Sequence, residues 1–69
     1  MQDSLIMLEL ETLEDVTSGD PSWRDLCDEV IELVKSGNFT NKTMIKNGII
    51  AIPDDDVRGY LTESLEFIF

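Results

Sequence analysis

The segment from Asp20 to Gly37 constrains the fold most, because it carries helix signals at both ends and a regular apolar pattern between them. Asp20 suits the N-cap position, and Pro21 suits the first helical position, where its missing N–H costs nothing. Gly37 follows the last periodic residue, at a place where helices often end in a left-handed conformation. The sequence therefore predicts a helix over residues 20–37 with an apolar face made of Trp23, Leu26, Cys27, Val30, Ile31, Leu33 and Val34.

The opposite face of this helix is acidic, and it carries Asp25, Asp28, Glu29 and Glu32. These residues form two like-charged pairs at i, i+4, each of which destabilises a helix by a few tenths of a kcal/mol. Carboxylates four residues apart recur about every 6 Å along a helix axis, within reach of the phosphate repeat of a nucleic-acid strand. Two interpretations stay open: a solvated face that keeps the protein soluble, or a row of anions that fits a nucleic-acid-binding protein.

The whole chain shares this negative character. Its 69 residues suffice for a single small domain, residues 1–69, and 15 acidic against 5 basic residues give a net charge of −10. Such a chain is repelled by bare nucleic acid and by anionic membrane surfaces. The partner that we expect is a basic protein, of the kind that itself binds DNA or RNA, rather than nucleic acid or a membrane.

Residue types that usually carry catalysis or metal binding are scarce. The chain has no histidine and one cysteine, Cys27, which lies in the apolar face of the predicted helix and is therefore expected in the core. The acidic triplet Asp54–Asp56 lacks the spacing of a calcium loop, and we interpret it as an N-cap with further negative charge at a helix start. The sequence predicts no enzyme, no metal site and no cofactor.

The apolar runs are too short to cross a membrane, since the longest have four residues, and the first residues lack the basic region of a secretory signal. A lone thiol is also best suited to a reducing compartment. We therefore expect a cytoplasmic protein.

Residues 4–16 fit two structures. Their leucine, methionine and glutamate content favours a helix that Asp3 or Ser4 would cap, and Ile6, Leu10 and Leu13 would share one face of it. Glu9 falls inside that apolar arc and weakens the pattern. Alternation of apolar and other residues from position 6 to position 11 supports a strand instead, and the helix is the structure we predict.

Residues 43–52 are predicted to form a β-hairpin around Asn47-Gly48, because this dipeptide favours the tight turn that joins two strands. The alternative is a short helix from Thr40 that ends at Gly48, followed by an extended segment. After Pro53, a last helix is predicted to begin in the acidic triplet and to run to about Phe67. Its inner face consists of Val57, Tyr60, Leu61, Leu65 and Ile68.

Gly59 lies inside this last helix, where a glycine costs about 1 kcal/mol relative to alanine. We therefore expect close packing at Gly59. The predicted fold class is α+β: three helices with a small two-stranded β-hairpin between the second and the third. The alternatives are an all-α bundle and a β-α-β-β-α arrangement.

The predicted function is that of a small non-enzymatic binder or inhibitor that presents carboxylates to a basic protein, such as a nucleic-acid-binding protein or a nuclease. Phage anti-defence proteins, antitoxins and nuclease immunity proteins act in this way as classes. The predicted contacts are Asp25, Asp28, Glu29 and Glu32, with Glu63 and Glu66 as a second cluster. The alternative is a self-associating structural or accessory protein, a homo-oligomer whose interface consists of Phe67, Ile68 and Phe69 and whose acidity serves solubility only.

Overall fold

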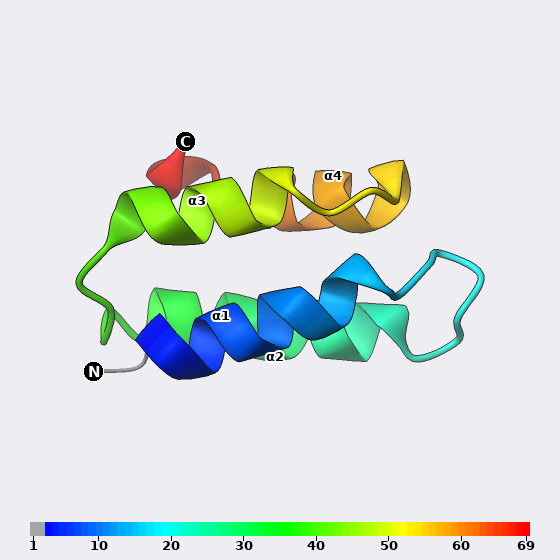
Figure 1. The fold of residues 1–69 in the computed structure, drawn as a ribbon, viewed down its shortest axis with the longest axis horizontal. Helices are drawn as coiled ribbons and strands as arrows, with labels where there is room; N and C mark the ends of the chain where they lie inside the picture. Colours follow the sequence, from blue (N-terminus) through cyan, green and yellow to red (C-terminus); the bar gives the residue numbers. More distant parts are fainter. Residues whose placement is uncertain (1–2) are drawn as a thin grey trace.

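Helices account for all the regular secondary structure of residues 3–69, the part of the chain that the computed structural model describes (Figure 1). The helices are α1 (Asp3–Glu14), α2 (Trp23–Lys35), α3 (Lys42–Ile50), α4 (Asp55–Ser64) and the short 3-10 helix η1 (Glu66–Ile68). No described residue forms a strand. The α+β prediction with its hairpin is therefore wrong, as is the β-α-β-β-α alternative, and the protein is a small all-helical domain.

The four α-helices surround one core. α1 packs against α2 and α3, and α4 packs against the same two helices. Figure 1 shows α1 and α2 together in one layer, α3 and α4 in a second layer above it, and η1 next to α3. Each α-helix thus makes its main contacts with two neighbours.

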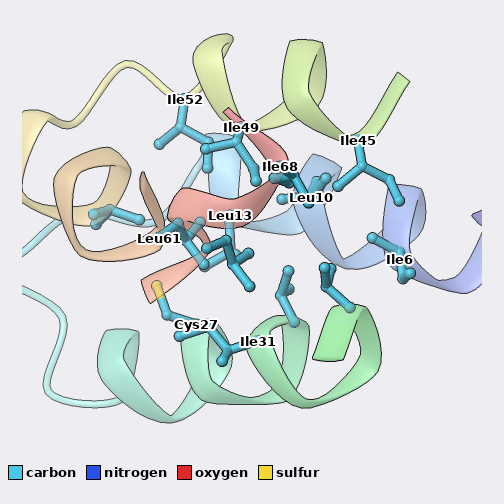
Figure 2. Packing of buried hydrophobic residues seen from close by; sticks show 14 residues of the cluster. Ile6, Leu10, Leu13, Cys27, Ile31, Ile45, Ile49, Ile52, Leu61 and Ile68 are labelled. Atoms are coloured by element: carbon cyan, nitrogen blue, oxygen red, sulfur yellow. The ribbon is translucent and has the colours of Figure 1, made fainter. Parts of the chain in front are cut away.

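The core consists of 14 buried side chains, and no polar or charged residue among those described is buried with them. Figure 2 shows these side chains converging from all four helices, with Leu13 and Leu61 near the middle. Cys27 is fully buried among them, which confirms its predicted place in the core. Burial, and to a smaller extent the charge of Asp28, raises the pKa of the Cys27 thiol to about 11, so the thiol stays protonated at neutral pH.

α1 confirms the predicted N-terminal helix and rules out the strand. Ile6, Leu10 and Leu13 recur at helical spacing, and all three are buried. Asp3, a predicted cap of this helix, instead reaches across to the loop before α3. Its carboxylate accepts hydrogen bonds from the backbone N–H of Thr40 at 2.9 Å, the Thr40 hydroxyl at 3.1 Å and the N–H of Asn41 at 2.9 Å. These donors, the Asn41 N–H foremost, lower the pKa of Asp3.

α2 begins two residues later than predicted, at Trp23 instead of Pro21. Its N-cap is Ser22, while the Asp20 carboxylate accepts hydrogen bonds from the Ser22 N–H and hydroxyl, both at 2.8 Å. Asp20 therefore closes the turn that leads into α2 rather than capping the helix itself. At the other end Gly37 has a φ of +78°, as the predicted left-handed conformation requires.

α3 replaces the predicted hairpin, and Asn47-Gly48 lies inside this helix. The N-cap is Asn41, whose side chain accepts a hydrogen bond from the Met44 N–H at 3.0 Å. Ile45 and Ile49, four residues apart, are both fully buried, so helical periodicity places them in the core. The alternative of a short helix from Thr40 is confirmed in part: a helix forms, but it begins at Lys42 and continues past Gly48 to Ile50.

Gly48 serves close packing in place of a turn. A Cβ atom at this position would lie 2.9 Å from Cδ1 of Leu10 and 3.2 Å from Cε of Met7, both in α1. The missing side chain is therefore what lets α3 approach α1.

α4 begins as predicted, since Asp54 is its N-cap and accepts hydrogen bonds from the N–H groups of Asp56 at 3.0 Å and Val57 at 3.1 Å. The same carboxylate also binds the Ser18 N–H at 2.8 Å, which joins the loop after α1 to the start of α4. These bonds, led by the one from Ser18, lower the pKa of Asp54. α4 ends at Ser64, earlier than predicted, because the chain bends at Leu65 into η1 and thereby buries Leu65 and Ile68.

Gly59 does not pack closely, contrary to the prediction. A Cβ atom at this position would meet no atom within 4 Å outside its own helix and chain neighbours. Gly59 therefore leaves an opening on the surface of α4, where an alanine would fit without displacing anything.

Candidate functional site

The four acidic residues predicted on the central helix lie together on the outer face of α2. Cys27, Val30, Ile31 and Val34 are buried and fix the inner side of this helix. The opposite side is exposed, and we call it the α2 acidic face; it consists of Asp25, Asp28, Glu29 and Glu32. The structure thus places these residues where the helical pattern predicted them, and their role as contacts to a partner stays a prediction.

No lysine or arginine within residues 3–69 forms an ion pair with the α2 acidic face. Within residues 3–69, the one ion pair joins Arg58 to Asp55 at the start of α4. Arg24, although it belongs to α2, has its guanidinium 5.2 Å from the ring centre of Trp23 and 6.0 Å from that of Tyr60. The negative charges of the α2 acidic face are therefore left to solvent, salt and any binding partner.

Tyr60 of α4 contacts the α2 acidic face through Asp28. The Tyr60 hydroxyl donates a 2.6 Å hydrogen bond to Asp28, and the Tyr60 ring meets that of Trp23 edge to face with 5.5 Å between ring centres. The hydrogen bond to the Asp28 carboxylate raises the pKa of Tyr60. Sequence reasoning placed Tyr60 on the inner face of its helix and missed this contact, because the contact depends on how α4 packs against α2.

An open groove of about 600 Å³ lies beside this aromatic pair. Glu63, from the second predicted cluster, is one of its lining residues and is exposed, and the half-buried Gly59 also lines it. The full lining consists of Ser18, Trp23, Arg24, Asp55, Asp56, Gly59, Tyr60 and Glu63. Its mixed charges, with Arg24 among three carboxylates, make it less uniformly acidic than the outer face of α2.

A second groove, of about 330 Å³, lies on the α1 side of the α2 acidic face. We call it the α1–α2 groove, and its lining consists of Leu5, Glu9, Glu29, Glu32, Leu33 and Ser36. Glu9 interrupts the apolar arc of α1 in the sequence. In the structure it is half-buried and lines this groove. Sequence reasoning missed Leu5 and Glu9 as site residues. The one signal that could have found Glu9 is its charge inside an apolar arc.

Glu66 does not share a helix with Glu63, although both were predicted on the last helix. The bend at Leu65 separates them, so that Glu63 lies in α4 and Glu66 begins η1. In the C-terminal tail, Phe67 and Phe69 are 56% and 43% exposed, whereas Ile68 is buried. Only the two phenylalanines are therefore available on the surface for an oligomer interface.

Charge is distributed unevenly between the two layers of helices. Ten of the acidic residues and two of the basic ones precede residue 36, which gives the part containing α1 and α2 a net charge of −8. The remaining five acidic and three basic residues give the part containing α3 and α4 a net charge of −2. The α2 acidic face thus belongs to the more negative layer of Figure 1.

Over residues 3–69, no three histidine, cysteine, aspartate or glutamate side chains are grouped so that they could hold a metal ion. Nor is any helix in this range both long and apolar enough to cross a bilayer. The candidate functional site consists of the α2 acidic face, whose four carboxylates are exposed together, and its two flanking grooves. No protein-family model matches the chain, and neither a curated protein nor a solved structure with significant similarity to it is found.

Proposed function

We propose that the protein is a non-enzymatic binder or inhibitor that presents the α2 acidic face to a basic surface on another protein. The observation that carries the proposal is the exposure of four carboxylates on one helix face, with no lysine or arginine of residues 3–69 in an ion pair with them. The proposed compartment is the cytoplasm, where a lone thiol such as Cys27 stays reduced.

The energetics of the α2 acidic face favour association with cations. Asp25 with Glu29, and Asp28 with Glu32, repel each other along the helix, and cations from a partner would relieve this repulsion. Electrostatic association of this kind is fast at low ionic strength and weakens as salt screens the charges, with a screening length of about 10 Å at 0.1 M. We therefore expect binding that decreases steeply between low and high salt.

The proposed partner is a protein that binds nucleic acid, or a nuclease, because such proteins carry cationic surfaces shaped for rows of anions. Carboxylates one helical turn apart would occupy that surface and exclude the polynucleotide. Phage anti-defence proteins, antitoxins and nuclease immunity proteins work in this way as classes. The protein would act by occupying a site, without turnover.

The test uses the intact protein as bait in a host lysate at 50 mM and 500 mM salt, followed by a competition assay in which the captured protein binds labelled DNA or RNA. One variant neutralises the α2 acidic face through the substitutions Asp25→Asn, Asp28→Asn, Glu29→Gln and Glu32→Gln. A matched variant changes the net charge by the same four units elsewhere through Glu11→Gln, Glu14→Gln, Asp15→Asn and Asn47→Lys, all at exposed positions outside both grooves.

We expect the first variant to lose capture and competition, and the matched variant to keep both. Circular dichroism and thermal unfolding of both variants verify that they are folded. Equal binding by the two variants would contradict the proposal, because the α2 acidic face would then have no special role. Capture of a partner that does not release nucleic acid would contradict the nucleic-acid-binding identity of the partner.

Self-association is the second candidate, and the exposure of Phe67 and Phe69 favours it. Large exposed aromatic side chains often mark contact surfaces. Because Ile68 belongs to the core, the test replaces only the two exposed residues, through Phe67→Ser and Phe69→Ser. Sedimentation equilibrium of the wild-type protein would detect a dimer that the double variant loses. A protein that stays monomeric at all concentrations up to about 1 mM would exclude this candidate, because a dimer with a weaker dissociation constant is not a specific assembly.

A further inference from the structure

We propose that the α1–α2 groove receives a basic amphipathic helix of the partner, with an apolar side chain of that helix seated on Leu5 and Leu33. This inference rests on the proposed function and deepens it, because it specifies where on the acidic side the partner docks and what chemistry the docking segment must have.

The floor of the groove is apolar and partly open to solvent. Leu5, in the first turn of α1, is 45% exposed, and Leu33 is a half-buried residue that packs against the core. Covering this floor with an apolar side chain would remove it from water and stabilise a complex.

Three carboxylates surround this floor. Glu9 comes from α1, and Glu29 and Glu32 come from α2, so negative charge is contributed by both helices that line the groove. None of the three is in an ion pair within residues 3–69. An apolar group that enters the groove therefore needs cations beside it, and a purely apolar or an anionic segment is disfavoured.

A basic amphipathic helix satisfies both requirements. On such a helix an apolar side chain has lysine or arginine neighbours three or four residues away, one turn to either side. The groove lies between two packed helices, which is the usual setting for a helix that docks through its apolar stripe. Nucleic acid has no such apolar anchor. A partner surface that binds only phosphates would therefore leave the floor of the groove uncovered, and the proposed partner must add an apolar side chain to its cations.

Two exposed leucines of α1 allow a matched test. Leu5 lines the groove, whereas Leu8 is 59% exposed, lies in the same helix and does not line it. The variants are Leu5→Ser and Leu8→Ser, which make the same chemical change in the same helix. The probe is a fluorescein-labelled, amidated 14-residue peptide made of two LKKLLKL segments, and its binding to the full chain is measured by fluorescence anisotropy at 50 mM salt.

We expect Leu5→Ser to weaken peptide binding about fivefold, as the loss of a half-buried leucine contact implies, and Leu8→Ser to change it less than about twofold. A second peptide with every leucine replaced by serine keeps the positive charge. It should bind wild-type protein and Leu5→Ser equally. Substitution of Glu9, Glu29 and Glu32 by glutamine should weaken binding of both peptides and flatten its salt dependence.

Equal effects of Leu5→Ser and Leu8→Ser would overturn the inference, as would equal binding of the two peptides to wild-type protein. These outcomes are separate from failure of the proposed function. If neutralising the α2 acidic face abolishes partner capture while the two serine variants behave alike, the proposed function holds and the groove is not the docking site. If the peptide test succeeds and the captured partner keeps its nucleic acid, docking in the α1–α2 groove is supported and the proposed function is contradicted.

Discussion

Two glycines inside helices should respond in opposite ways to the same substitution. Gly59 in α4 and Gly48 in α3 both have helical surroundings, and neither has a positive φ. An alanine stabilises a helix interior by about 1 kcal/mol relative to glycine, mainly because glycine loses more backbone entropy on folding. Any difference between Gly59→Ala and Gly48→Ala must therefore come from what the added methyl group meets.

At Gly59 the methyl group meets nothing within 4 Å beyond its own helix and neighbours, so the gain in helix propensity is kept. Gly59→Ala should raise the free energy of unfolding by about 1 kcal/mol. For a domain of this size that corresponds to a rise in Tm of about 4–8 °C.

At Gly48 the methyl group would lie 2.9 Å from Cδ1 of Leu10, whereas carbon atoms in good contact are about 3.5–4.0 Å apart. Leu10 is only 1% exposed, so its side chain can move aside only within the packed core. Overpacking of this kind costs about 1–3 kcal/mol, which the propensity gain of about 1 kcal/mol offsets in part. Gly48→Ala should therefore lower the free energy of unfolding by up to about 2 kcal/mol.

Urea unfolding followed by circular dichroism at 222 nm measures both changes, and thermal unfolding gives the corresponding Tm values. A double variant should show the sum of the two changes, because the glycines lie in different helices and have different neighbours. Stabilisation by both substitutions, to a similar extent, would refute the reasoning, since it would mean that α3 does not approach α1 closely at Gly48.

Two further predictions concern Asp54 and the C-terminal tail. The pKa of Asp54 is lowered in the folded protein, so its hydrogen bonds stabilise the fold above the unfolded-state pKa of about 3.9 and lose this effect as the pH falls through the folded-state value. Asp54→Ala should therefore lower Tm at pH 7, and the Tm gap to the wild-type protein should narrow below about pH 4; a gap that is constant from pH 7 to pH 2 would contradict this. Ile68→Ala should lower the free energy of unfolding by about 2–5 kcal/mol because Ile68 is buried, while Phe67→Ala should change it by less than about 0.5 kcal/mol; equal losses in urea unfolding would show that the tail does not pack as described.

Local signals predicted the parts of the fold that depend on neighbours in the chain. Asp54 as an N-cap and Gly37 as a left-handed helix end follow from the chemistry of single residues, and both are confirmed. Likewise, the three- and four-residue spacing of Val30, Ile31 and Val34 correctly predicted the buried side of α2.

The hairpin prediction failed because Asn47-Gly48 has two uses. In isolation this dipeptide favours a tight turn, but a glycine is equally required where two helices touch. Contact with Leu10, 38 positions earlier in the sequence, decides between the two uses, and local patterns contain no information about it. Gly59 shows the converse: close packing was predicted there from the residue type alone, yet no atom of another helix lies within 4 Å of an added Cβ.

The candidate site was predicted in the same unequal way. The α2 acidic face lies on one helix, so its residues could be placed from periodicity alone. The α1–α2 groove and the Tyr60–Asp28 hydrogen bond each involve two helices. They depend on which helices pack together, and local sequence patterns do not specify this.

The uneven charge of the two helical layers affects how the molecule orients near a charged surface. With a net charge of −8 on the part that holds α1 and α2 and −2 on the other, the centre of negative charge is displaced from the centre of mass toward α1 and α2. The molecule is consequently an electric dipole as well as an anion, and the field of a cationic surface exerts a torque on it. A cationic surface would therefore favour approaches in which the α1 and α2 layer leads.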